Sequence, residues 1–299
     1  MIKASYEVLQ PVSGHSFLVR KFGKSAFDAP YHFHEEFELT YIVHGHGKRY
    51  VGSHMQDFTS GDLVFLGANL PHCWKLEANE PGNDDASAIV VQFNANFLGD
   101  DFFNKDELQG VRKLLLKSRS GISFNSLTQS SVNRNMKHLA EEKSNFKMLI
   151  CLLEILQRLA ISSEYILLDQ HRSVAEQTRA EQERINPVFA YLVENFRGQV
   201  SLDEAAGIAH MTPNAFCKYF KKITRKTFME TVIEYRLNYA TQQLVQTDKP
   251  ISEISFDSGF GDVSHFYKMF KQKMHQSPLN YRKNFMREFE AGSKDHIFA

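Results

Sequence analysis

The chain has few of the residues that build disulfide-rich or metal-finger proteins. It contains only three cysteines in 299 residues, and Cys73, Cys151 and Cys217 are far apart and in no metal-finger spacing. This pattern excludes a disulfide framework and favours a reducing, cytoplasmic setting. The chain also has no apolar run long enough to span a bilayer, and its first residues do not resemble a signal peptide. We therefore expect a soluble cytoplasmic protein that has no membrane partner.

Net charge is also absent, since 35 basic residues balance 35 acidic ones, but the charges are unevenly placed. Residues 185–287 hold 14 Lys and Arg against 9 Asp and Glu, a net charge of +5, so the remainder carries −5. A basic module joined to an acidic one is typical of a nucleic-acid-binding part attached to a part with another role. A chain of this length is expected to form about two domains, each with its own core.

The first hundred residues have the pattern of β-strands. Short runs rich in Val, Ile, Phe and Tyr are separated by turns that contain Gly, Ser, Asp or Pro, with no helix between them. This pattern favours a sandwich or a barrel. The predicted strands are 16–22, 37–43, 48–52, 62–66, 72–76 and 87–93.

Within this region, histidines and a glutamate recur at regular spacing. His32, His34 and Glu38 are separated by even numbers of residues, so on one extended strand their side chains would share a face. Gly45 follows, and Pro71-His72 comes later. This order resembles the two motifs of the cupin barrel, His-x-His-x3-Glu-x6-Gly followed by Gly, Pro and His. In metal-binding cupins the three His and the Glu are the ligands, a donor set that suits Fe, Mn, Ni or Zn.

The same residues can instead line a pocket for a small molecule, and we favour this interpretation over a metal site because the two motifs are incomplete. Small barrels that are open at one end hold one ligand inside. Aromatic faces beside His and Glu suit a polar molecule such as a sugar, and a plain core role for the aromatics is the alternative. No cofactor is predicted, and His32, His34, Glu38 and His72 remain the alternative metal ligands. The predicted ligand-binding residues are His32, His34, Glu38, Tyr41, Tyr50, His72 and Trp74.

From residue 106 the apolar period changes to that of helices, which are predicted over 107–117, 128–142 and 145–162. The last of these has apolar residues on two faces, which is more than a helix packed on a barrel needs. We therefore expect residues 106–168 to form a dimerisation region, the alternative being a helix buried between its two neighbours. Residues 169–184 have almost no apolar side chains and predict a polar linker.

The C-terminal part contains one pattern twice, at an offset of 50 residues. Phe216-Cys217-Lys218-Tyr219-Phe220-Lys221 recurs as Phe266-Tyr267-Lys268-Met269-Phe270-Lys271, and each predicts an amphipathic helix with its two Phe facing inward. A short helix and a sharp turn are predicted before each copy, which is the arrangement of a helix-turn-helix. A helix over 228–246, about 28 Å long at 1.5 Å per residue, would connect the two units.

Capping signals mark the ends of these helices. A helix is predicted to open at Asn186-Pro187. Ser201 and Glu204 predict a capping box, and Thr212 followed by Pro213 predicts an N-cap with proline at the first helical position. Asp262 is the predicted N-cap of the second recognition helix.

The stretch 200–283 resembles the DNA-binding module of the AraC/XylS family of bacterial transcription regulators. The matching residues run in order through Ser201-Leu202, Met211-Thr212-Pro213, both Phe-x3-Phe-Lys units and Ser277-Pro278-x2-Tyr281-Arg282. Many members of this family also carry an N-terminal cupin-like domain and a helical middle. His210 and Arg225 stand where glycine is common in the family, so left-handed backbone is expected at both.

The resemblance implies an α+β multidomain protein: a cupin-like ligand-binding barrel over 1–105, the helical region, an all-α double helix-turn-helix domain over 185–287 and a tail over 288–299. It implies a homodimeric regulator, usually an activator, whose partners are double-stranded DNA, a small-molecule effector and RNA polymerase. Such a protein is not an enzyme. The alternatives are a metal-dependent cupin enzyme fused to a DNA-binding module, and a ligand-free architectural protein. The residues expected to contact DNA are Asn214, Cys217, Lys218, Lys221 and Lys222, then Val263, Ser264, Tyr267, Lys268 and Lys271.

Overall fold

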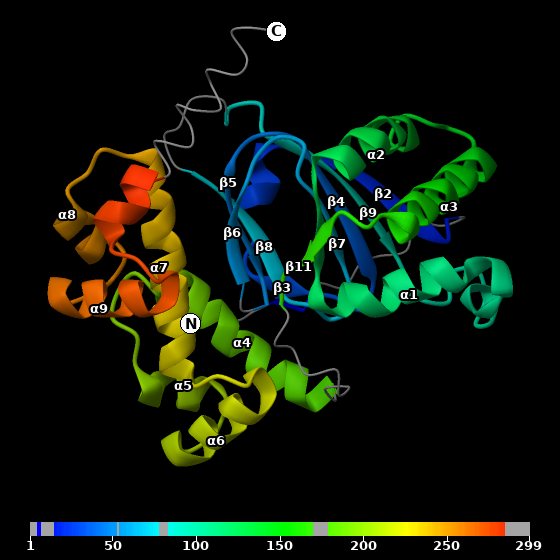
Figure 1. Cartoon of the computed structure of the whole chain (residues 1–299). Helices are drawn as coiled ribbons and strands as arrows, with labels where there is room; N and C mark the ends of the chain where they lie inside the picture. The colour runs from blue at the N-terminus through cyan, green and yellow to red at the C-terminus, as the bar shows by residue number, and fades with distance from the viewer. Residues whose placement is uncertain (1–4, 7–14, 53, 78–82, 170–178, 285–299) are drawn as a thin grey trace, which may run out of the picture. The chain divides into compact units, whose positions relative to one another are not determined.

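The chain forms two compact units, which divide within one helix. The computed structural model describes residues 5–6, 15–52, 54–77, 83–169 and 179–284 (Figure 1). The first unit ends at Ala190 and the second begins at Tyr191, so the division falls inside α4 (Arg179–Asn195). The predicted combination of an N-terminal β domain and a C-terminal all-α domain is confirmed.

Two sheets make up the β part of the first unit. Every strand pairing in them is antiparallel except that of β1 with β3. The five-stranded sheet runs in the order β1 (Ser5–Tyr6), β3 (His32–Phe33), β8 (His72–Leu76), β5 (Gly47–Val51) and β6 (His54–Phe58). The six-stranded sheet runs in the order β11 (Tyr165–Leu167), β10 (Ile122–Phe124), β7 (Leu63–Leu66), β4 (Phe37–His44), β9 (Ser87–Phe93) and β2 (Phe17–Phe22).

Three helices cover the outer face of the six-stranded sheet: α1 (Gln109–Lys117), α2 (Ser126–Leu139) and α3 (Asn145–Ile161) (Figure 1). Leu39 and Phe65 of the sheet join Met136 and Ile155 of the helices in one core, and all four are fully buried. Burying each such side chain stabilises the fold by roughly 1.5–3 kcal/mol. The three predicted helices are therefore present, and their apolar faces hold them against the sheet.

The region between residues 106 and 168 is not purely helical, which differs from the sequence prediction. Strands β10 and β11 pair with each other, and β10 also pairs with β7, so this region completes the six-stranded sheet. Each strand is only three residues long. Runs this short have too few positions for a period of two to be recognised in the sequence.

The second unit contains two helix-turn-helix pairs. The first pair is α5 (Leu202–Ile208) and α6 (Pro213–Thr224), and the second is α8 (Ile251–Asp257) and α9 (Val263–Met274). Helix α7 (Phe228–Gln246) connects them. Phe216 and Phe220 of α6 pack on Phe228, with ring centroids 5.4 and 5.5 Å away. Phe266 and Phe270 of α9 are likewise fully buried, in a cluster that contains Phe260.

The two recognition helices begin as predicted. The side chain of Thr212 accepts a hydrogen bond from the backbone N–H of Ala215, and that of Asp262 accepts one from His265. At α5 only half of the predicted capping box forms. The Ser201 hydroxyl accepts from the N–H of Glu204, but the Glu204 carboxylate accepts from the Tyr191 hydroxyl at 3.0 Å.

Helix α4 begins at Arg179, seven residues before the predicted start at Asn186-Pro187. The predicted linker 169–184 is therefore helical from Arg179, while residues 170–178 lie outside the described part of the chain. Arg, Ala, Glu and Gln, which fill the first two turns, are strong helix formers even without an apolar face. Pro187 consequently lies within the helix rather than at its first position.

Candidate functional site

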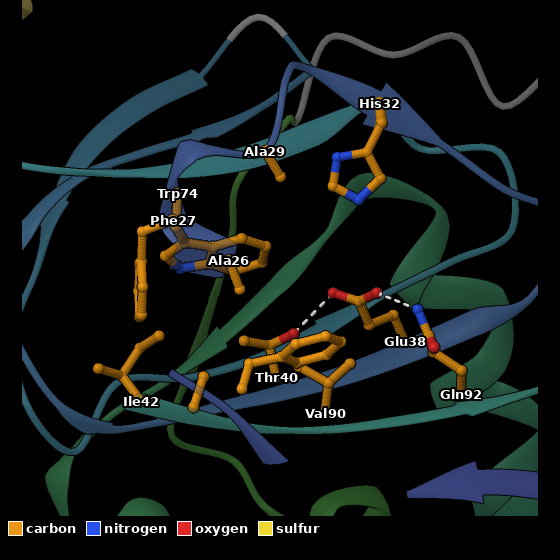
Figure 2. A pocket seen from close by; sticks show the side chains of 12 residues that line it. Ala26, Phe27, Ala29, His32, Glu38, Thr40, Ile42, Trp74, Val90 and Gln92 are labelled. Atoms are coloured by element: carbon orange, nitrogen blue, oxygen red, sulfur yellow. Dashed lines mark hydrogen bonds between the residues drawn. The ribbon is translucent and has the colours of Figure 1, made fainter. Parts of the chain in front are cut away.

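A cavity of about 190 Å³ lies between the two sheets of the first unit (Figure 2). Its floor is made by three directly opposed residue pairs of β4 and β9: Glu38 with Gln92, Thr40 with Val90, and Ile42 with Ala88. All six side chains point inward because alternate residues of a strand share a face. Polarity therefore falls from one pair to the next along the floor.

The opposite wall comes from β3, β8 and the short 3-10 helix η1 (Lys24–Asp28). It contributes His32 and Trp74, together with Phe27 from η1. Figure 2 shows His32, Glu38 and Gln92 on one side of the cavity and Phe27, Trp74 and Ile42 on the other. The cavity thus has a polar end and an apolar end.

A buried hydrogen-bond network centres on the carboxylate of Glu38. The carboxylate lies 2.9 Å from Nε2 of His34, accepts a hydrogen bond from the Thr40 hydroxyl at 2.6 Å and another from the Gln92 amide at 2.8 Å. Nε2 of His72 lies 3.5 Å away. Burial alone would raise the pKa of Glu38, but the charge of His72 and the hydrogen bond with His34 outweigh it and hold this pKa well below its ordinary value.

Three histidines meet beside this carboxylate. Ring nitrogens of His32, His34 and His72 lie within 4.8 Å of one another. Nδ1 of His32 is 2.8 Å from the carbonyl oxygen of Pro30, and Nδ1 of His72 is 2.7 Å from that of Leu70. When each Nδ1 donates to its carbonyl, Nε2 of the neutral ring carries the lone pair that a metal ion needs. Burial, followed by the charge of His72, lowers the pKa of His32 to about 3, so this ring is neutral near pH 7.

The three histidines offer nitrogen donors of the kind that suits a divalent transition metal, and Glu38 lies beside them, 2.9 Å from His34. They do not converge in the way that the spacing predicted, however. His32 ends up in the five-stranded sheet and Glu38 in the six-stranded sheet, because the chain bends at residues 34–36 and crosses between them. The convergence comes from the two sheets facing each other and not from one continuous strand.

Two predicted ligand-binding tyrosines do not line the cavity. Tyr41 alternates with Thr40 and Ile42 on β4, so it faces the outer core beneath the helices, where burial raises its pKa. Tyr50 is opposite Cys73 in the sheet, and this pair lies on the other face of β5 and β8 from Trp74. Both corrections follow from the period of two.

Two polar residues of the site, Thr40 and Gln92, were missed in the sequence, as were the apolar residues of its lining. Thr40 shares the face of Glu38 and is two residues away, so the even spacing could have identified it. Gln92 could not be found in this way, because its place beside Glu38 depends on the register between β4 and β9. The remaining predicted residues are close together: His32, Glu38 and Trp74 line the cavity, and His34 and His72 lie behind its polar end.

The second candidate site is the outer surface of the two recognition helices. All the residues predicted to contact DNA are on α6 or α9, and each is exposed except Val263, which is partly exposed. The first set is Asn214, Cys217, Lys218, Lys221 and Lys222, and the second is Val263, Ser264, Tyr267, Lys268 and Lys271. Because the two Phe of each helix are buried, the opposite face of the helix is exposed to solvent.

An ion-pair bridge links the two helix-turn-helix units. Glu234 of α7 binds Lys226, which follows α6, and also Lys273 of α9. Burial alone would raise the pKa of Glu234, but the hydrogen bonds from both lysines lower it below its ordinary value. One carboxylate thus contacts both units and neutralises one lysine of α9.

Comparison with known proteins assigns both parts of the chain. A family model described as a helix-turn-helix domain matches residues 205–284, and one described as a cupin domain matches residues 19–83. An uncharacterised HTH-type transcriptional regulator of Bacillus subtilis, YdeC, is 20% identical over 263 residues, which cover 85% of this chain and 86% of YdeC. The bifunctional transcriptional activator and DNA repair enzyme AdaA of B. subtilis is 31% identical over 100 residues, 33% of this chain and 47% of AdaA.

The crystal structure of ToxT from Vibrio cholerae aligns with 89% of this chain and 97% of the ToxT chain, with 15% identity and a TM-score of 0.34. Among the described residues, no helix is both long and apolar enough to cross a membrane. The exposed faces of α6 and α9 lie within the segment that matches the helix-turn-helix domain, and the cavity lies in the unit that contains the cupin match. The chain thus combines an AraC-type helix-turn-helix domain with an N-terminal cupin domain, the make-up of a DNA-binding transcription regulator.

Proposed function

We propose that this protein is a ligand-responsive regulator, in which a small molecule bound in the barrel changes how the two helix-turn-helix units of a dimer meet DNA. The observation that carries the proposal is the cavity between the sheets, in the same chain as two recognition helices with exposed lysines. Cavities with apolar walls and a few converging polar groups are the usual form of small-molecule sites.

The test begins with selection of duplexes from a random library by the full-length protein. The affinity of the protein for the selected duplex is then measured with and without a bound effector, and the ratio of the two affinities is the effector ratio. Double substitution of Lys218→Ala and Lys268→Ala should abolish selection, and His72→Ala should bring the effector ratio to one. If every molecule that binds the barrel leaves the DNA affinity of the wild-type protein unchanged, the proposed ligand response is rejected.

We further propose that α3 contacts its counterpart in a second copy. Phe146 is 72% exposed and Ile150 is 41% exposed, and both lie on one stripe of the helix. Lys147 and Glu154 flank Ile150 on one edge of that stripe. In an antiparallel pair centred near Ile150, Lys147 of each copy would face Glu154 of the other, so the surface is complementary to itself.

Sedimentation velocity at several protein concentrations tests this contact. Phe146→Glu should shift the protein to monomer, whereas Leu127→Glu, at a similarly exposed position on α2, should not. Exchanging the charges with Lys147→Glu and Glu154→Lys together should restore a dimer that either single change weakens. A wild-type monomer at micromolar concentration would remove the contact.

Activation through RNA polymerase is the remaining part of the proposal, and it rests on what the family usually does. Transcription from a promoter that carries the selected duplex, with purified polymerase, decides the sign. More transcript with the regulator supports activation, and less identifies a repressor.

A metal-dependent role of the barrel is the second candidate, favoured by the three converging histidines and Glu38. A bound divalent ion would polarise an oxygen of a ligand as a Lewis acid. Metal analysis of the purified protein tests it: near-stoichiometric Fe, Mn, Ni or Zn that is lost in His34→Ala supports the site. The control is His138→Ala on the exposed surface of α2. A substoichiometric metal content that is the same in all variants would reject it.

A further inference from the structure

The cavity floor restricts the chemistry of the ligand, and this inference rests on the proposed role of the barrel as a ligand site. The pair Glu38 and Gln92 is polar, the pair Thr40 and Val90 is mixed, and the pair Ile42 and Ala88 is apolar. A ligand that fills the cavity therefore meets most of the hydrogen-bonding groups at one end. The other end offers hydrocarbon and aromatic surface.

Most of the polar groups at that end are already engaged with one another. The carboxylate of Glu38 accepts hydrogen bonds from Thr40 and Gln92 and also contacts His34. Among the described residues, Oε1 of Gln92 and Nε1 of Trp74 are buried without a hydrogen-bond partner, although both residues line the cavity. The acceptor Oε1 of Gln92 and the donor Nε1 of Trp74 are thus available to a ligand.

A sugar does not suit this lining. Each buried hydroxyl without a partner costs about 1–3 kcal/mol, and a hexose brings more hydroxyls than a polar end whose groups are mostly engaged with one another can satisfy. The apolar end would also desolvate hydroxyls without replacing their bonds to water. The aromatic face of Trp74 and the side chains of Phe27 and Ile42 favour a hydrocarbon body instead.

The volume limits the size of that body. A cavity of about 150 Å³ accommodates benzene. About 190 Å³ therefore holds one ring, or a short branched chain, with one small polar group. Three alanines among the lining residues, Ala26, Ala29 and Ala88, leave this space open, since each ends at Cβ.

We propose that the cavity binds a compact amphipathic molecule, with a single-ring or short branched apolar body and one hydroxyl or amine head that donates a hydrogen bond to Gln92. The body lies between Trp74, Phe27 and Ile42. A carboxylate head is disfavoured because it would face the charge of Glu38 at the polar end.

Isothermal titration calorimetry with the full-length protein tests this chemistry with four probes. Benzyl alcohol and benzylamine carry the expected body and head, toluene carries the body alone, and glucose is polyhydroxylated. At least one of the first two should bind at one site, toluene should bind at least tenfold more weakly than that probe, and glucose should give no heat of binding.

Two variants locate the binding. Ala88→Leu fills the apolar end and should weaken benzyl alcohol at least tenfold, whereas Ala215→Leu, on the exposed face of α6, should leave it unchanged. Gln92→Met keeps the size of the side chain but removes the acceptor. The variant should therefore bind benzyl alcohol no more tightly than it binds toluene. Thermal unfolding of both variants establishes that they are folded.

The outcomes separate the ligand class from the regulatory role. Glucose binding that is lost in Ala88→Leu, with no binding of the aromatic probes, would overturn the amphipathic class but keep the barrel as a ligand site. The amphipathic class is also overturned if none of the aromatic probes binds. Binding of benzyl alcohol that depends on Ala88 and Gln92 supports the class, even where DNA affinity does not respond and the regulatory proposal fails.

Discussion

The two helix-turn-helix units are near repeats, and they differ mainly where they face solvent. Both recognition helices have 12 residues, a side-chain N-cap, and a left-handed residue at the C-terminal end, Arg225 in the first and His275 in the second. Both bury two Phe at positions four apart, and none of these rings is exposed. The buried residues that the fold requires are thus kept in both helices, whereas the exposed residues differ between them.

The turns show a second difference. The left-handed residue is His210 in the first unit and Gly259 in the second, 49 positions later, while the N-caps Thr212 and Asp262 are 50 apart. The second turn is therefore one residue longer, and Gly261 is the addition. A Cβ on Gly259 would lie 2.7 Å from the carbonyl oxygens of Phe196 and Arg197, so that position must be glycine.

The largest expected effect tests whether the two cores are equivalent. Phe216→Ala and Phe266→Ala should each lower the free energy of unfolding by about 3–5 kcal/mol, because each leaves a cavity in a fully packed core. Phe256→Ala is the control, since this ring is 55% exposed and its loss should cost under about 0.5 kcal/mol. Urea unfolding followed by far-ultraviolet circular dichroism measures all three. A loss in one unit less than half that in the other would break the equivalence.

The second prediction concerns the turns. Gly259→Ala should destabilise by about 1–3 kcal/mol, because φ is +89° and the new methyl group meets two carbonyl oxygens. His210→Gly, at the corresponding position, should change stability by less than about 1 kcal/mol, since relief of the left-handed strain offsets the extra backbone entropy. Thermal unfolding compares the two, and equal destabilisation would contradict the difference between the turns.

The third prediction concerns phosphate contacts. Lys218→Ala and Lys268→Ala should each lower the slope of log K against log salt by about 1 on a random-sequence duplex, if each lysine contacts one phosphate. Lys273→Ala is the matched comparison on α9, and it should lower the slope less because Glu234 already neutralises this lysine. Fluorescence anisotropy over a salt series gives the slopes. A drop for Lys273→Ala as large as that for Lys268→Ala would mean that the bridge opens on DNA.

The smallest effect concerns the bridge between the units. The Glu234 side chain is 15% exposed, so solvent weakens its ion pairs only in part. Glu234→Gln should therefore lower the free energy of unfolding by about 0.5–1 kcal/mol near pH 7. Because the pKa of Glu234 is lowered in the folded state, its contribution is complete above the ordinary value of 4.5 and is lost as pH falls through the folded pKa. Urea titrations of wild type and variant should therefore converge in acid. A gap that persists after the carboxylate is protonated would assign the cost to packing.

The repeat in the second unit could be predicted from the sequence almost residue by residue, because Phe216, Phe220, Phe266 and Phe270 mark the helix period directly. His210 and Arg225 adopt the expected left-handed backbone, with φ of 55° and 62°. The barrel was less accessible. Its strands could be recognised one at a time, but which side chains meet in the cavity depends on pairing between strands that are distant in sequence, as for Gln92 and Glu38.

The position of one residue in the cavity wall has a spectroscopic consequence. Trp74 is the single tryptophan of the chain, it lines the cavity, and it is 9% exposed. When the protein is excited at the red edge of aromatic absorption, its emission arises from this one indole. A shift in emission wavelength or a quench therefore reports on occupancy of the barrel. Trp74 can thus serve as an intrinsic fluorescent probe of ligand binding in the cavity.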